Sequence, residues 1–165
     1  MLPILQARPI CGLLLRLLRG PESVAAAAAV VAADGGLAIL VSALGQGEEV
    51  GFFAAACLLK ISEAGATHLA ALVAAGAVPR LLETLKRVEA EAGADDSRSG
   101  MRSAAQTLLN LTALEGASVA AEAAAAGFDA ARLRQLGELP DEPLVAAPVT
   151  TLGDLTVTAG RRPQR

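Results

Sequence analysis

The sequence predicts an almost entirely α-helical protein built from repeated helical units, and three observations support this. Most of the apolar residues in a chain that is 53% hydrophobic and 2% aromatic are Ala and Leu, both strong helix formers. The segments that follow Gly35, Gly76 and Gly127 align without gaps as GLAILVSAL, AVPRLLETL and FDAARLRQL. These glycines are 41 and 51 residues apart, the spacing of a stacked helical repeat of roughly 40 residues with one insertion.

The first part of the chain is expected to form four helices separated by breakers. Gly20-Pro21 ends the first helix, because Pro cannot continue the backbone hydrogen-bond pattern. Asp34-Gly35-Gly36 separates the second helix from the third, and Gly45-Gln46-Gly47 forms the next turn. The predicted helices are Ile10–Arg19, Glu22–Ala33, Leu37–Leu44 and Glu48–Ser62.

The same cycle is expected again after residue 62. Thr67 is the predicted N-cap of a helix that ends at Gly76, and Pro79 lies in the first turn of the next helix, where proline is tolerated. The acidic segment 88–100 has almost no apolar residue to bury, so we expect a helix end followed by a mobile surface loop. The predicted helices are Thr67–Ala75, Val78–Arg87, Met101–Thr112, Ser118–Ala126 and Asp129–Leu136.

These elements divide the chain into an array over residues 1–139 and a tail. The array contains a partial repeat 1–20, repeats 21–62 and 63–113, and a partial repeat 114–139. Residues 140–165 contain four prolines and lose the helical periodicity, which is typical of a disordered tail.

Charge and composition limit the function classes. A net charge of −3 provides no general attraction to polyanions, so no nucleic-acid partner is expected. Asp34 interrupts the longest apolar run, where an uncompensated carboxylate is costly in a membrane, so no membrane span is expected. Cys11 and Cys57 both lie in apolar runs, typical of buried thiols in a reducing compartment, which favours a cytoplasmic or nuclear location.

The N-terminal segment leaves two interpretations open. Arg8, Arg16 and Arg19 occur with no acidic residue before Glu22, as in an organelle transit peptide. The leucines of the same segment also have the spacing of an ordinary packed helix.

The unit of three helices at 67–75, 78–87 and 100–112 resembles an armadillo repeat. AGAVPRLLETL matches the Gly-Ala-Ile-Pro-x-Leu-x-x-Leu-Leu stretch of that family, and AAQTLLNLT matches the Ala-x-x-Ala-Leu-x-Asn-Leu segment of its third helix, H3. The resemblance covers roughly residues 10–137. It implies a short right-handed α-solenoid in which successive H3 helices line a concave face.

In that family the Asn of the H3 segment commonly holds the backbone of an extended peptide, and the resemblance carries this role to Asn110. The corresponding positions of the preceding H3 helices are Lys60 and Arg16, and we call all three residues the ladder positions. Lys and Arg offer only donors and positive charge, so an acidic or phosphorylated peptide is the expected ligand. The alternatives are that Asn110 contacts a neighbouring loop and that Lys60 and Arg16 are solvated surface charges.

No catalytic or metal-binding pattern is present. The sequence contains no phosphate-binding glycine loop, nucleophile elbow or paired metal-binding histidines. His68, the single histidine, is expected at the surface, and the acidic residues Glu89, Glu91, Asp95 and Asp96 lack the spacing of a calcium loop. Neither an enzyme activity nor a cofactor is predicted.

The sequence therefore favours a protein-interaction scaffold that binds a protein or peptide along its H3 face. The alternative is a structural segment of a larger array, or of an assembly, that packs through its open ends or on a second copy, because about three units are usually needed for a stable array.

Overall fold

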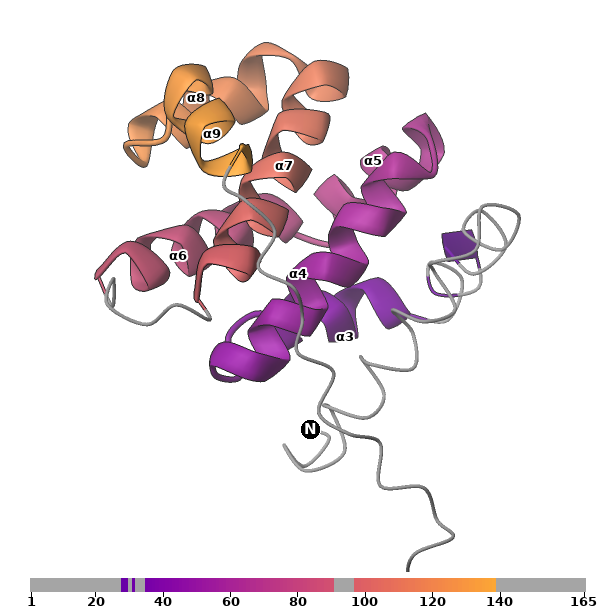
Figure 1. Cartoon of the computed structure of the whole chain (residues 1–165). Coiled ribbons are helices and arrows are strands. Elements are labelled where there is room, and N and C mark those ends of the chain that lie inside the picture. The colour runs from indigo at the N-terminus through magenta and orange to yellow at the C-terminus, as the bar shows by residue number, and fades with distance from the viewer. Residues whose placement is uncertain (1–27, 30, 32–34, 91–96, 139–165) are drawn as a thin grey trace, which may run out of the picture.

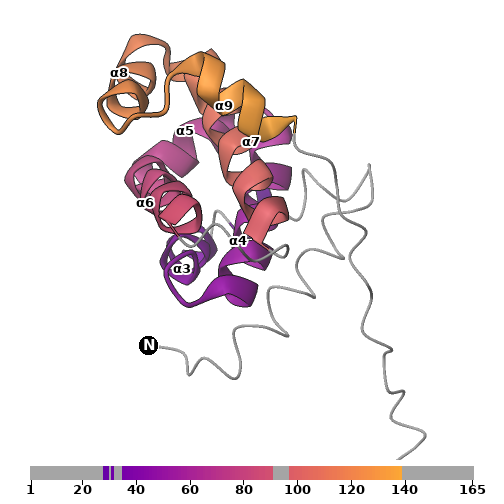
Figure 2. The same cartoon turned by 60° about the vertical axis from the view of Figure 1, so that its left-hand side comes forward.

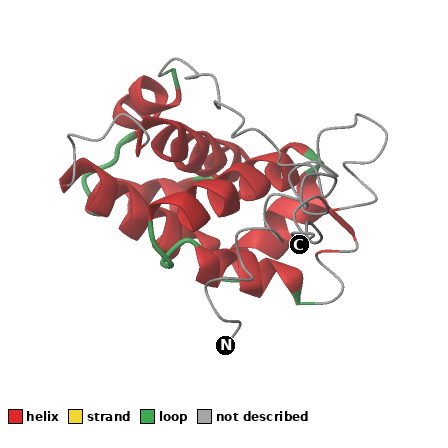
Figure 3. Ribbon diagram, turned by 60° about the horizontal axis from the view of Figure 1, so that its bottom comes forward, coloured by secondary structure: helices red, strands yellow, loops and turns green. Residues whose placement is uncertain are grey.

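The computed structural model describes residues 28, 29, 31, 35–90 and 97–138, and this part of the chain is helical without any strand (Figures 1 and 3). The predicted all-α class is therefore confirmed for these residues. The predicted tail 140–165, the first helix at 10–19 and most of the second lie outside the described residues. The helices are α3 (Gly36–Ala43), α4 (Glu48–Glu63), α5 (Ala66–Ala74), α6 (Ala77–Ala90), α7 (Ser97–Glu115), α8 (Ala117–Ala125) and α9 (Ala130–Gly137).

Glycines with positive φ separate most of these helices. Gly35, Gly76 and Gly127, the three residues on which the repeat was aligned, have φ of 70°, 74° and 93°. A side chain at such a backbone conformation is strained, so glycine is the residue that allows each sharp turn between short helices. The aligned glycines therefore share a backbone role as well as a sequence position.

Two predictions about helix ends are wrong. Thr67 does not cap α5, because the helix begins one residue earlier and Gly65, with φ of 126°, is its N-cap without a side-chain hydrogen bond. The helix end expected at the start of segment 88–100 is present, since α6 continues to Ala90, but α7 begins at Ser97 and not at Met101 as predicted. Gly100 belongs to α7 and lies against α4: a Cβ there would be 3.6 Å from the Cα of Phe52, an ordinary van der Waals contact.

Four helices form the centre of the molecule. Packing joins α3 to α4, α4 to α7, α7 to α6 and α6 to α3, and the α4–α7 interface is the most extensive of these (Figure 2). Small residues allow this closeness: Ala54 and Ala55 of α4 and Ala104 and Ala105 of α7 are fully buried. Dispersion and hydrophobic burial by the leucines of all four helices stabilise the arrangement. Leu40, Leu58, Leu81, Leu85 and Leu108 have at most 1% of their surface exposed.

A side-chain hydrogen bond also joins α6 to the end of α3. The half-buried Arg87 donates from Nη2 to the carbonyl oxygen of Leu44, over 2.9 Å. Carbonyls at the C-terminal end of a helix have no partner within the helix and carry partial negative charge, so a cationic donor there is favourable.

Candidate interaction surface

The helices α4 and α7 lie side by side and run in the same direction. Phe52, near the start of α4, lies under Gly100 near the start of α7, and Ser62, near the end of α4, contacts Asn110 in the second half of α7. Residues LLKIS of α4 correspond to LLNLT of α7 in the sequence. The ladder positions Lys60 and Asn110 are therefore equivalent residues on two parallel, neighbouring helices.

Asn110 links the two helices through its amide. Its Nδ2 donates to Oγ of Ser62 over 2.9 Å, and that hydroxyl in turn donates to the carbonyl oxygen of Leu59 over 2.7 Å. The Oδ1 of Asn110 accepts a longer hydrogen bond, 3.4 Å, from Nε2 of Gln106 one turn earlier. An amide has two N–H groups and two acceptor lone pairs. The half-buried side chain thus keeps one N–H and one lone pair beyond these hydrogen bonds.

Lys60 pairs within its own helix. Its Nζ is 2.8 Å from Oε2 of Glu63, and the two side chains are 38% and 44% exposed. Exposed ion pairs of this kind contribute on the order of 0–1 kcal/mol, so a competing anion can replace Glu63 at little cost. Arg16, the third ladder position, lies outside the described residues.

Half-buried residues surround the two described ladder positions. On α4, one turn before Lys60, Ala56 is partly exposed, and Phe53 is partly exposed two turns before it. On α7 the corresponding neighbour of Asn110 is Gln106. The exposed side of the α4–α7 pair therefore combines an apolar part on α4 with amides on α7 and one ammonium group.

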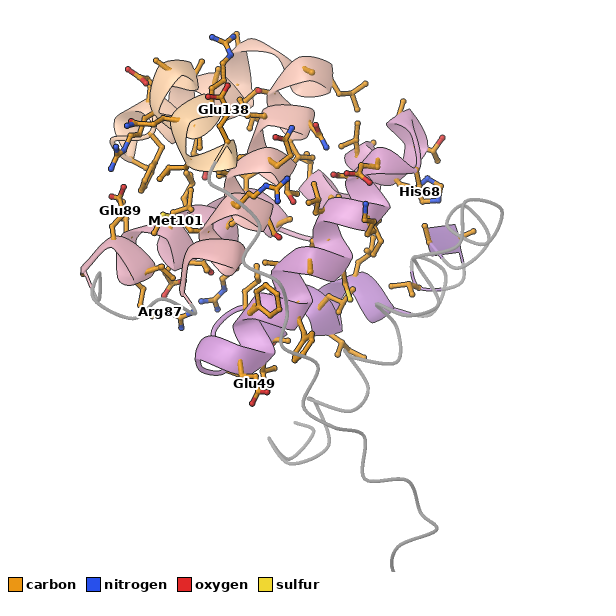
Figure 4. All side chains as sticks on the ribbon, in the orientation of Figure 1. Glu49, His68, Arg87, Glu89, Met101 and Glu138 are labelled. Carbon is orange, nitrogen blue, oxygen red and sulfur yellow. The ribbon has the colours of Figure 1, made fainter. Side chains whose placement is uncertain are left out.

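The other candidate residues do not converge on a site. His68 is half-buried on α5, on the opposite side of the molecule from Glu89 (Figure 4), and its Nδ1 has no hydrogen-bond partner among the described residues. Glu89, one of the acidic residues without calcium-loop spacing, forms an ion pair: its Oε1 is 2.8 Å from Nη2 of Arg132 on α9. Glu91, Asp95 and Asp96 lie outside the described residues.

Further observations concern a local ion pair, metal ligands and the described cysteine. Arg80 and Glu83 form a local ion pair on α6, with 2.8 Å between Nη1 and Oε2. Within 35–90 and 97–138, no group of three His, Cys, Asp or Glu residues is placed to hold a metal ion. Cys57 is fully buried, as its apolar surroundings in the sequence suggested.

Ser62 is the residue of this surface that the sequence did not indicate. A signal for it existed, because Ser62 and Thr112 occupy equivalent positions and each donates its hydroxyl to the carbonyl three residues earlier in its own helix. A hydroxyl bonded in this way still has acceptor capacity. The repeated hydroxyl therefore marks a position that can accept a hydrogen bond from a side chain of the next parallel helix.

Comparison with known proteins gives no match to a family model, a curated protein or a solved structure. Among the described helices none is long and apolar enough by itself to cross a membrane, although α5 and α6, bent by 76° at their junction, pass the length and composition criteria as a pair.

Proposed function

We propose that the chain is a protein-interaction module with a short right-handed solenoid of armadillo type. In this proposal α3 and α4 are the second and third helices of repeat 21–62, and α5, α6 and α7 are the three helices of repeat 63–113. The parallel packing of α4 on α7, beside the packing of α3 on α6, supports this assignment. Equivalent helices of successive units are neighbours, as they are in stacked helical repeats.

The proposed ligand is an extended peptide that lies across the exposed side of α4 and α7. The geometry of Asn110 is the observation that carries this proposal: its amide is held by Ser62 and retains a donor and an acceptor. An extended peptide presents N–H and C=O groups that need such partners when they leave water. The hydrogen bond to Ser62 fixes the side chain in advance, which lowers the entropy cost of binding.

An acidic or phosphorylated peptide is the ligand class that the ladder positions favour. The ammonium group of Lys60 is available at the cost of an exposed pair with Glu63, and a phosphate offers stronger, charge-assisted hydrogen bonds than that carboxylate does. Arg16 adds a second positive charge to the same set in the proposal.

The experiment is a selection of displayed random peptides on the full chain, with acidic and phosphoserine-containing libraries, followed by fluorescence anisotropy of the selected peptides. Lys60→Glu is expected to weaken binding at least tenfold, since it reverses a charge at the site. The matched control is Lys86→Glu, the same change on an exposed residue of α6. Equal affinities in both variants would show that the peptide binds elsewhere.

A second pair of variants separates peptide binding from helix packing. Asn110→Ala removes the amide, whereas Ser62→Ala removes its partner and keeps the amide. If Asn110 holds the peptide, the first variant loses binding and the second retains most of it. Equal losses in the two variants would assign Asn110 to the α4–α7 interface alone.

The alternative function is a structural segment that packs through its ends, and one observation favours it. Ile39 on α3 is a large apolar residue with 51% of its surface exposed, which a neighbouring unit could cover. A sharp, cooperative thermal transition of a monodisperse monomer would count against this alternative, because an incomplete array should unfold gradually.

A further inference from the structure

The last helix breaks the symmetry of the repeat. In the preceding unit α6 packs on α3 and α7 and barely touches α4, whereas α9, its sequence equivalent, packs extensively on α7 (Figures 1 and 2). The neighbour that packs most extensively on α4 is α7, an H3 helix, and the corresponding neighbour on the far side of α7 is α9. Thus α9 lies where the next H3 helix of a regular stack would be.

The end of α9 contacts α7, and one of the contacted positions is equivalent to a position of α4 that contacts α7. The Nε of Arg102 donates to the carbonyl oxygen of Gly137 over 3.3 Å, and Arg102 is equivalent to Phe52, which supports α7 from α4. A Cβ at Gly137 would be 3.1 Å from Oε1 of Gln106 and 3.6 Å from Cδ1 of Leu109, so the end of α9 approaches α7 closely.

Where α4 has Phe52, α7 has Arg102 at the equivalent position, and an arginine there suits the end of α9. A phenylalanine offers apolar surface to a neighbouring helix, but a guanidinium group can bond the carbonyls that have no partner at a helix C-terminus. The partial negative charge of that end favours the cation further. This side of α7 is therefore adapted to the end of a short helix rather than to the side of another H3.

The outward side of α9 is polar. Its buried side chains are Leu133 and Leu136, with 1% and 5% exposure, while Arg134 and Gln135 are exposed. Arg132 takes the aligned position at which the two earlier units have the buried leucines of α3 and α6, and it is 44% exposed. Terminal units of helical arrays need such a polar outer side to remain soluble.

We propose that α9 is a cap that closes this end of the helix stack against a further unit or a second copy of the chain. It packs on α7 with its two leucines buried and presents charge outward, so an additional helix would meet the polar side of α9. This inference needs the helix stack but is independent of peptide binding.

The test is sedimentation velocity of the full chain and two variants over a wide range of protein concentration. The wild-type chain and Arg134→Asp, a charge change on the outer side of α9, are expected to remain the same species. Leu136→Asp places a carboxylate under α9, releases the helix and exposes the side of α7, so its average mass is expected to rise with concentration towards that of a dimer. A Leu136→Asp chain with unchanged helical content and unchanged mass would overturn the proposal.

Two further outcomes are decisive. If the wild-type chain self-associates and Arg134→Asp abolishes this, the outer side of α9 is itself an interface and the cap assignment is wrong. If Leu136→Asp does not fold, a Leu136→Cys chain lacking its two native cysteines replaces it, with the labelling rate of the buried thiol as the readout. Adding Arg102→Ala is expected to raise that labelling rate about tenfold, because it removes one charged hydrogen bond that holds α9. An unchanged rate would overturn the proposal.

Discussion

The hydrogen bond between Asn110 and Ser62 makes a quantitative prediction about the packing of α4 on α7. The bond joins neutral groups over 2.9 Å, and Ser62 is only 3% exposed. Such bonds contribute about 1 kcal/mol net. In both Asn110→Ala and Ser62→Ala this loss is offset by about 0.5 kcal/mol, because Ala is the better helix former at each position, so each variant should lower the free energy of unfolding by about 0.5 kcal/mol. The double variant should reveal a coupling energy of about 1 kcal/mol between the two residues.

The assay is urea unfolding followed by far-UV circular dichroism for the wild type, both single variants and the double variant. Thr112 supplies the matched control, because its hydroxyl makes the same bond within its own helix, 2.8 Å to the carbonyl of Leu109. A cycle of Asn110→Ala with Thr112→Ala should be additive to within about 0.5 kcal/mol. The reasoning is refuted if the coupling of Asn110 to Ser62 is no larger than this control.

Three further predictions test the packing, the turns and the inter-unit contact. Leu108→Ala should destabilise the chain by about 3 kcal/mol in the same urea assay, because the side chain is fully buried and its removal leaves a cavity. Gly76→Ala should lower the free energy of unfolding by about 1 kcal/mol, since φ is 74° there. Gly45→Ala should be neutral or slightly stabilising, because the added Cβ makes only ordinary contact and φ is not in the left-handed region. Equal effects of the two substitutions would contradict the backbone argument. Arg87→Ala should cost about 1.5 kcal/mol through its bond to the end of α3, against less than about 0.5 kcal/mol for the exposed Lys86→Ala, and similar thermal midpoints for these two variants would show that the bond does not contribute.

Within the described residues, the sequence by itself predicted each helix and most helix boundaries closely, because these depend on neighbouring residues. Alanine and leucine favour helix locally, and a glycine such as Gly76 stops a helix through its own φ. The equivalence of α4 and α7 was also visible as repeated residues, including the pair Lys60 and Asn110.

Only the tertiary structure decided which residues meet across the repeats. The partner of Asn110 is 48 residues away at Ser62, and the partner of Glu89 is 43 residues away at Arg132. No local periodicity encodes such pairs, because they depend on how helices from different units pack. The same holds for α9: its sequence aligns with that of α6, but it packs on α7, where the carbonyl of Gly137 accepts a hydrogen bond from Arg102.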